Sequence, residues 1–307
     1  MNIVYMSNPD FGIRPMERLN EAYGLSLVVT GLDKRRGRGK KLKPSPVKAR
    51  ALELGIEVYQ PEDINSEESL RYLKSFDPDL FIVVAFGKIL SKKALEVPKY
   101  SINIHASLLP KLRGAAPINR AILEGYDKSG ISIMKMAEGL DTGDVAMVKE
   151  VTIEDKSADE LSQELSNLGA DMIVDFVERF KENKLEFSKQ DDSKATYAEK
   201  ISKEDGYIDF NKDTAKDIER ILRAMPERYS ISTSYKGERF KIKDLETDYE
   251  KTLGSPGEII DSTKKLRIAT LDGSIYVKKL QFPGKKEMDI KSYLAGNSLD
   301  KGTILGG

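Results

Sequence analysis

The stretch DLFIVVAFGKILSKKALEVPKYSINIH, residues 79–105, contains two apolar runs separated by a short helix-like segment. The first run, DLFIVVAF, is rich in Ile, Val and Phe and lacks alternating polar positions, which is typical of a strand buried on both faces, and the second, SINIH, is a short run with two Ile residues. A helical connection between such strands is the usual crossover of a parallel sheet. This stretch therefore predicts a strand–helix–strand unit.

The same alternation extends over residues 1–150. Further strands are predicted at residues 2–6, 25–30, 130–139 and 145–153, and helices at residues 12–23, 45–54, 66–76, 91–95 and 158–182. Strands that alternate with helices form a sheet covered on both faces. The sequence thus predicts an α/β, Rossmann-like domain with a mostly parallel sheet, whose last strands can have antiparallel neighbours.

The character of the sequence changes near residue 189. Residues 189–206 are polar and weakly periodic, which indicates a linker. A short helix near residues 213–225 and several short strands follow, with a hairpin signal in LDGS, residues 271–274. We expect the α/β domain to cover residues 1–188 and a small C-terminal, OB-like β-barrel domain to cover residues 207–307.

The composition excludes several kinds of site. The 307 residues include no cysteine and one histidine, so disulfides, thiolate metal sites and multi-histidine metal sites are excluded, and we expect no metal. No apolar window reaches the length of a membrane span, and the N-terminus begins directly with a strand rather than a leader. We expect a cytoplasmic monomer that does not bind membranes.

The single histidine, His105, ends the second run of the opening stretch, two residues after Asn103. On a strand, residues i and i+2 project on the same face. Ligands of an open parallel sheet bind outside the carboxyl ends of its strands. The amide and the imidazole are therefore expected to share one cleft.

Two hydrogen-bond donors that converge on one point suit an oxygen that becomes negative in a transition state. A carboxylate that stabilises the protonated imidazole would complete the site, and Asp141 in EGLDTGD, between Gly139 and Gly143, is the best candidate. On these residues alone, a hydrolase and a group transferase both remain open. So does a plain structural role for His105 at the end of a strand.

Residues INIHASLLPKLRGAAPINRAILEG and GISIMKMAEGLDTGD resemble the signature of the methionyl-tRNA formyltransferases, within the folate-dependent formyltransferase superfamily. The resemblance extends to FIVVAFGKIL, ATYAEKISKEDGYIDF and GKKEMDIKSYLAG, and so covers nearly the whole chain. Residues 7–9, Ser-Asn-Pro, stand where Gly-Thr-Pro is common in the family.

The resemblance implies transfer of a formyl group from 10-formyltetrahydrofolate to the α-amine of methionine on initiator tRNA. It implies that Asn103 and His105 stabilise the oxyanion and that Asp141 pairs with His105. Because the substrate amine is the nucleophile, neither cysteine nor metal is required. The residues implied to bind the folate are Ser107, Leu108, Leu109, Pro110, Ile89 and Leu90, although Ile89 and Leu90 can equally be core residues.

Residues 33–50 concentrate positive charge in a chain with 50 basic and 50 acidic residues, since this segment has nine Lys and Arg residues and one Asp. Such a segment is either a solvated surface or a site for phosphate groups. The resemblance implies that it contacts the tRNA, with Arg38 as the main recognition residue and Arg36, Lys40 and Lys41 on the backbone.

Three alternatives have different requirements. A formyltransferase that acts on a sugar nucleotide or on glycinamide ribonucleotide would use the same three residues, but without this basic segment and a C-terminal barrel. A non-catalytic tRNA-binding protein would not need the three residues. A nicotinamide-dependent enzyme is disfavoured because the turn after the first strand, SNPDFG, lacks the glycine fingerprint.

Overall fold

The computed structural model describes residues 1–36, 41–250 and 254–306. The chain divides into two compact units. The first comprises Met1–Ala121, Asp127–Glu154 and Asp159–Lys200, and the second comprises Ile122–Tyr126, Asp155–Ala158 and Ile201–Gly307.

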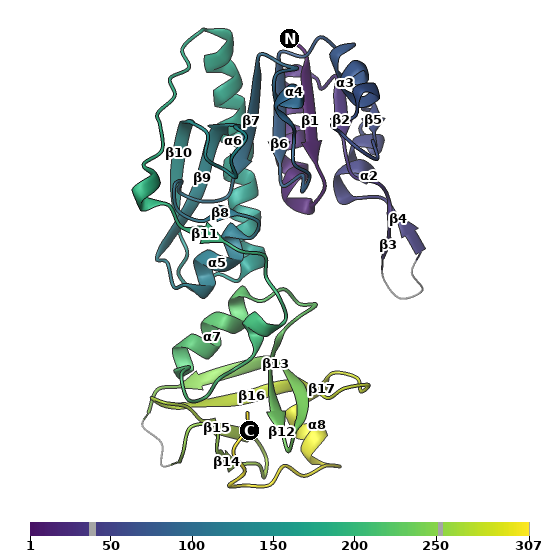
Figure 1. The fold of residues 1–307 in the computed structure, drawn as a ribbon. Helices are drawn as coiled ribbons and strands as arrows, with labels where there is room; N and C mark the ends of the chain where they lie inside the picture. Colours follow the sequence, from purple (N-terminus) through teal and green to yellow (C-terminus); the bar gives the residue numbers. More distant parts are fainter. Residues whose placement is uncertain (37–40, 251–253, 307) are drawn as a thin grey trace. The chain divides into compact units, whose positions relative to one another are not determined.

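The first unit is built on a sheet with the strand order β10-β9-β7-β6-β1-β2-β5. Figure 1 shows β7, β6, β1, β2 and β5 side by side, and these strands are parallel, whereas β9 runs antiparallel to both β7 and β10. The predicted mostly parallel α/β sheet is therefore confirmed. The strands are β1 Ile3–Ser7, β2 Leu27–Val29, β5 Val58–Tyr59, β6 Leu80–Val84, β7 Tyr100–His105, β9 Lys128–Lys135 and β10 Val145–Thr152.

The helices begin where the sequence provides caps. In α2, α3 and α4, the Oγ of Ser45, Ser66 or Ser91 accepts a hydrogen bond from the backbone N–H three residues later. This bond satisfies one of the donors that the first helical turn leaves unpaired. The predicted helices are confirmed to within a few residues: α1 Ile13–Tyr23, α2 Pro46–Glu53, α3 Glu67–Lys74, α4 Lys92–Leu95 and α6 Ala158–Lys181.

Helices cover both faces of the sheet. On one face, Val4 and Phe81 of neighbouring strands belong to a buried cluster with Leu73 of α3 and Ala94 of α4. On the other face, α6 approaches so closely at Gly169 that a Cβ atom there would lie 3.0 Å from the Ile104 side chain. Within the described ranges, we find no helix that combines the length and the apolar character of a membrane span.

Several short elements were not predicted. Helix α5 covers Pro117–Leu123, and the 3₁₀ turns η1 and η2 cover Asp10–Gly12 and Asp192–Lys194. The basic segment contains an antiparallel ribbon of β3 (Lys34–Arg36) and β4 (Lys41–Lys43), where no strand was predicted. A small parallel pair, β8 (Arg113–Gly114) with β11 (Tyr197–Ala198), joins two segments that are far apart in the sequence.

The second unit contains a curled antiparallel sheet in the order β12-β13-β16-β15-β14, and β17 also pairs with β16. The long strands β13 and β16 lie next to each other (Figure 1). The predicted small β-barrel type of domain and the hairpin at residues 271–274 are confirmed. Its elements are η3 Glu204–Gly206, α7 Ala215–Ala224, β12 Ile231–Tyr235, β13 Glu238–Asp248, β14 Ile259–Asp261, β15 Leu266–Ala269, β16 Ser274–Gln281, β17 Met288–Asp289 and α8 Ile290–Leu294.

The loop at residues 136–144, between β9 and β10, folds tightly. It is closed at its base by a hydrogen bond of 2.8 Å from the Lys135 N–H to the Asp144 carbonyl. Gly143 lies directly against this base, since a Cβ atom on it would lie 1.7 Å from the Lys135 carbonyl oxygen. The loop can follow this path only with glycine at residue 143.

We predict that Gly143→Ala destabilises the protein, because the added methyl group overlaps a backbone atom that cannot rotate away. Overpacking of this kind costs about 3 kcal/mol in the free energy of unfolding. Thermal and urea unfolding would measure the loss. The control is Gly296→Ala, where a Cβ atom meets nothing within 4 Å. Equal stability of the two variants would contradict the packing described for the loop.

Candidate functional site

The carboxyl ends of β1, β6 and β7 meet at one edge of the sheet. From β1 the chain adds β2 and then β5 on one side of β1, and it then crosses to the other side to form β6. The topological switch point of the sheet therefore lies between β1 and β6. Asn8, directly after β1, bridges the neighbouring loops: its Oδ1 accepts from the Gly31 N–H at 2.7 Å, and its Nδ2 donates to the Phe86 carbonyl. Open α/β sheets bind ligands at this position.

Asn103 and His105 both lie on β7, as predicted. His105 is 5% exposed. Its Nε2 lies 2.9 Å from the Leu112 carbonyl oxygen. A carbonyl oxygen only accepts, so Nε2 carries a hydrogen and donates it. Leu112 is itself held in a left-handed conformation, with φ 58°, and its N–H donates to the Thr196 Oγ1 at 2.9 Å.

Asp141 joins these two residues from the loop at residues 136–144. Its Oδ2 lies 3.6 Å from the His105 Nδ1 and accepts a hydrogen bond of 2.8 Å from the Gly114 N–H. Its Oδ1 accepts from the Asn103 Nδ2 at 3.3 Å. The structure thus brings Asn103, His105 and Asp141 together, although residues 103 and 141 are far apart in the sequence.

This geometry restricts the chemistry of the imidazole. Because Nε2 donates to Leu112, Nδ1 is a donor only when the ring is protonated. The Asp141 carboxylate faces that nitrogen, and opposite charges at this distance attract. The arrangement can hold a proton at Nδ1 and present the second amide hydrogen of Asn103 to a ligand. Among the described residues, no group of His, Asp or Glu side chains is arranged to hold a metal ion.

The segment at residues 107–110 is closely tied to the sheet. The Ser107 hydroxyl is buried and donates to the Lys111 carbonyl at 2.6 Å. The Leu109 N–H donates to the Ser132 Oγ at 3.1 Å, and this hydroxyl donates to the Ser107 carbonyl at 2.7 Å. Leu108, Leu109 and Pro110 are half-buried, so each can present part of its surface to a ligand.

The two apolar residues after β6 differ in their environments. Ile89 is 85% exposed, and its carbonyl accepts from the Asn65 Nδ2 at 2.9 Å. Leu90 is buried in the core cluster together with Phe86. The exposed side chain of Ile89 can contact a ligand at the switch point. The buried side chain of Leu90 cannot contact a ligand and can only pack beneath the residues that do.

The basic ribbon presents charge to solvent. Lys34 and Lys41 are exposed, and Lys41 lies opposite Arg36 in the register of β3 and β4. The predicted residues Arg38 and Lys40 lie outside the described residues. Next to the ribbon, Asp33 forms an ion pair of 2.8 Å with Lys48, and hydrogen bonds from Lys48 and Gln60 hold the pKa of the Asp33 carboxyl below its ordinary value.

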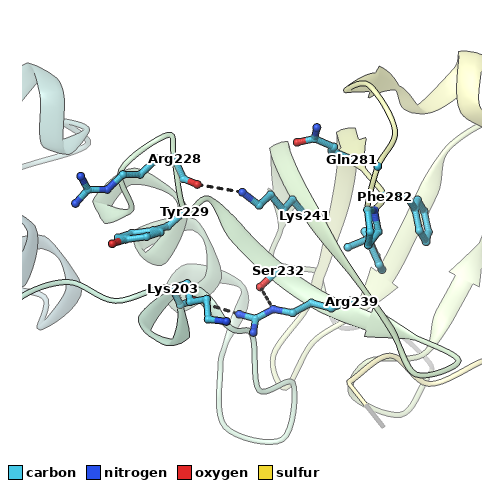
Figure 2. A pocket seen from close by; sticks show the side chains of 11 residues that line it. Lys203, Arg228, Tyr229, Ser232, Arg239, Lys241, Gln281 and Phe282 are labelled. Atoms are coloured by element: carbon cyan, nitrogen blue, oxygen red, sulfur yellow. Dashed lines mark hydrogen bonds between the residues drawn. The ribbon is translucent and has the colours of Figure 1, made fainter. Parts of the chain in front are cut away.

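The second unit has a basic pocket of about 470 Å³. Of the described residues that line it, none is acidic. Figure 2 shows its cationic side chains, with the Lys241 Nζ donating to the Arg228 carbonyl and the Arg239 Nε donating to the Ser232 Oγ. The lining residues are Lys203, Arg228, Tyr229, Ser232, Arg239, Phe240, Lys241, Gln281, Phe282, Pro283 and Gly284.

The charges of this pocket are only partly balanced. Arg239 forms an ion pair of 3.0 Å with Glu204. Partial burial, together with the neighbouring cations Lys243 and Arg239, lowers the pKa of Lys241 below its ordinary value. A bound anion would offset this repulsion. The aromatic wall is rigid, because the Phe282 ring stacks on Phe240 with centroids 4.9 Å apart. The pocket therefore suits a phosphate group attached to an apolar or aromatic body.

Sequence reasoning missed two residues that hold the Asp141 loop in place, Arg113 and Gln190. The Gln190 Nε2 donates to the carbonyls of Asp141 and Gly143, and its Oε1 accepts from Arg113. Gln190 lies in the polar segment that was interpreted as a linker, where no periodicity distinguishes it. The only local signal for Arg113 is its position before a glycine in KLRGAAP, residues 111–117. This signal does not indicate that Arg113 binds Gln190.

A profile of the formyl transferase family matches residues 11–177, and a profile of the formyl transferase C-terminal domain matches residues 200–298. Among solved structures, a sugar 3N-formyl transferase, WlaRD, is similar with a TM-score of 0.64 and 19% identity over 93% of this chain and 98% of that chain.

HypX from Aquifex aeolicus, in complex with tetrahydrofolic acid, is similar with a TM-score of 0.63 and 16% identity. The match covers 98% of this chain and 50% of that chain, so this chain spans about half the length of HypX. At such identities these structures support the fold alone.

Two relatives are similar over their whole length. A methionyl-tRNA formyltransferase of Alkaliphilus metalliredigens is 41% identical over 310 residues, which cover 100% of this chain and 98% of the relative. A methionyl-tRNA formyltransferase of Clostridium tetani is 42% identical over 309 residues, 99% of each chain. By this identity along both units, the chain belongs to the methionyl-tRNA formyltransferase family.

Proposed function

We propose that this protein transfers a formyl group from 10-formyltetrahydrofolate to the α-amine of methionyl initiator tRNA. The observation that carries the proposal is the cluster of Asn103, His105 and Asp141 at the carboxyl edge of the sheet. Support comes from identities of 41% and 42% with methionyl-tRNA formyltransferases over the full chain. In this role the protein acts in the cytoplasm, where translation starts, and as a monomer.

In the reaction, the amine nitrogen bonds to the formyl carbon, and the bond from that carbon to the folate nitrogen breaks. The formyl oxygen carries negative charge between the two events. The Asn103 amide and the protonated Nδ1 of His105 are the donors that can stabilise this charge. Loss of one donor of this kind costs about 3–4 kcal/mol of barrier.

The proton released by the amine is transferred to the folate nitrogen that leaves. The Asp141 carboxylate is arranged to hold that proton in between, while His105, whose Nδ1 lies 3.6 Å from Oδ2, stays protonated. The Leu112 carbonyl accepts the Nε2 hydrogen, so the Nδ1 hydrogen is the ring donor that is left for the oxyanion. General acid–base catalysis by such a group contributes about 10²–10⁴-fold to the rate.

The folate binds against the segment at residues 107–110 and the loop after β6. The fit is supported by two exposed apolar side chains at loops of this edge, Ile89 at 85% exposure and Leu140 at 62%. Apolar surface of this kind suits an aromatic ring system. Ser107, Leu108, Leu109, Pro110 and the core residue Leu90 support this surface, and the folate supplies the formyl group when bound.

The tRNA is bound by charge at two places. The ribbon at β3 and β4 offers Arg36 and Lys41, together with Arg38 and Lys40 outside the described residues. The C-terminal domain, proposed to cover residues 207–307 after a linker at residues 189–206, offers the pocket shown in Figure 2. Clustered cations neutralise phosphates and release counterions, which supplies affinity without sequence preference.

A sugar nucleotide is the less favoured amine substrate. The sugar N-formyltransferases among the similar structures share 19% and 21% identity with this chain. Identity with the methionyl-tRNA formyltransferases is about twice as high. The exposed basic ribbon also fits a polyphosphate such as tRNA better than a single nucleotide.

We predict that Asn103→Ala and His105→Ala each lower kcat for formylation of methionyl initiator tRNA by about 10²–10³-fold, because each removes one donor to the oxyanion. The assay uses 10-formyltetrahydrofolate, with methionyl elongator tRNA as the substrate control and the exposed Asn211→Ala as the matched variant. Wild-type protein that formylates neither tRNA would overturn the proposed function. Full turnover by both folded variants would overturn the roles of the donors.

We predict that Arg228→Gln and Lys241→Gln weaken the affinity for initiator tRNA, because each removes a cation from the pocket. The slope of log affinity against log salt should fall by about 0.9 for each lost phosphate contact. Filter binding over a range of salt concentrations measures both. Lys212→Gln is the control, since Lys212 already pairs with Asp209 at 2.7 Å. Unchanged affinity and slope would remove the pocket from the tRNA surface.

A further inference from the structure

The segment at residues 188–198 is joined to both loops of the site. At one end, the Ser188 N–H and carbonyl each form a hydrogen bond of 2.9 Å with Val145, which directly follows the Asp141 loop. At the other end, the Arg113 N–H donates to the Thr196 carbonyl at 2.9 Å, and β11 pairs with β8. The segment therefore connects the loop that carries Asp141 with the loop that follows His105.

Between these ends, the Gln190 side chain uses every hydrogen bond that an amide can make. Its Nε2 donates to the Asp141 carbonyl at 2.8 Å and to the Gly143 carbonyl at 2.7 Å. Its Oε1 accepts from the Arg113 Nε at 3.1 Å and from Nη2 at 2.8 Å. An amide has two hydrogens and two lone pairs on its oxygen, so four hydrogen bonds to three residues fix its orientation.

Arg113 anchors this arrangement from below. The residue is 2% exposed, and its Nη2 also pairs with Asp192 at 2.7 Å. A buried guanidinium is tolerated only when its donors are paired. Loss of the Gln190 oxygen would leave donors of Arg113 buried without a partner, which costs free energy. The next residue, Gly114, donates its N–H to the Asp141 Oδ2 at 2.8 Å. Strand β8 thus contacts Asp141 in two ways. Arg113 holds the Asp141 backbone through Gln190, and Gly114 binds the Asp141 carboxylate directly.

We propose that Gln190 is a positioning residue that sets the Asp141 carboxylate against the His105 ring. Asp141 has a left-handed backbone, with φ 51°, so its side-chain direction depends on a conformation that few residues adopt unaided. By holding the carbonyls of Asp141 and Gly143, Gln190 maintains that conformation. The consequence for catalysis rests on the proposed function, but the geometry can be tested without it.

The proposal depends on the two hydrogens of the Gln190 Nε2, which bind the carbonyls of Asp141 and Gly143. Gln190→Glu keeps the size and the bond to Arg113, but it places a carboxylate oxygen against two carbonyl oxygens. Gln190→Met keeps the length and removes every hydrogen bond. The matched control is Gln163→Met, because Gln163 is an exposed residue of α6. Circular dichroism and thermal unfolding select the variants that fold, and Gln190→Glu replaces Gln190→Met should the latter not fold.

The chain has one histidine, so its imidazole signals in a proton–nitrogen NMR spectrum belong to His105. We expect these signals to shift in Gln190→Met and to stay unchanged in Gln163→Met. In the formylation assay, kcat of Gln190→Met should fall about 10–100-fold, because a displacement near 1 Å costs this much. The KM values for tRNA and folate should stay within about two-fold, since a positioning residue touches neither substrate.

A double-mutant cycle decides whether Gln190 acts through Asp141. In the Asp141→Asn background, Gln190→Met should cause no further loss of kcat. The same fold-loss in both backgrounds, or unchanged imidazole signals together with an unchanged kcat, would overturn the proposal. Should the wild-type protein transfer no formyl group, the proposed function fails while the NMR comparison still decides whether Gln190 positions Asp141.

Discussion

The structure of the site depends on the hydrogen bonds that the Asp141 carboxylate accepts. The Gly114 N–H reaches Oδ2 at 2.8 Å and the Asn103 amide reaches Oδ1 at 3.3 Å, while the His105 Nδ1 lies 3.6 Å away. These partners come from two strands, β7 and β8, and Asp141 itself comes from the loop after β9. A carboxylate that ties them together both orders the loops and provides the charge that a protonated imidazole requires.

The sheet explains how a residue so far along the sequence reaches this position. β9 returns antiparallel to β7, with Lys135 opposite Ile102, so the loop at residues 136–144 starts near the beginning of β7 rather than at its end. The loop then turns back toward His105, and Gly143 allows this path. The antiparallel return of β9 therefore brings Asp141 to Asn103 and His105 from a loop that lies outside the parallel part of the sheet.

Much of this could be predicted from local patterns. The alternation of apolar runs with helix-like segments predicted the strands and helices, and the i, i+2 spacing predicted that Asn103 and His105 share a face. The support from Gln190 could not be predicted, because a side chain that binds backbone carbonyls 47 and 49 residues away leaves no pattern in the sequence. The ribbon of β3 and β4 was missed for a related reason, since the residues of β4 are exposed and the ribbon lacks the apolar alternation of a packed strand.

The central claim is that the Asp141 carboxylate serves the chemical step rather than the binding of either substrate. The most direct measurement is the single-turnover rate of formyl transfer by Asp141→Asn, with tRNA and folate affinities measured on the same preparation. The account predicts a fall of about 10²-fold or more in the rate, with both affinities within about two-fold of the wild type. An unchanged single-turnover rate, or a loss confined to the affinities, would contradict it.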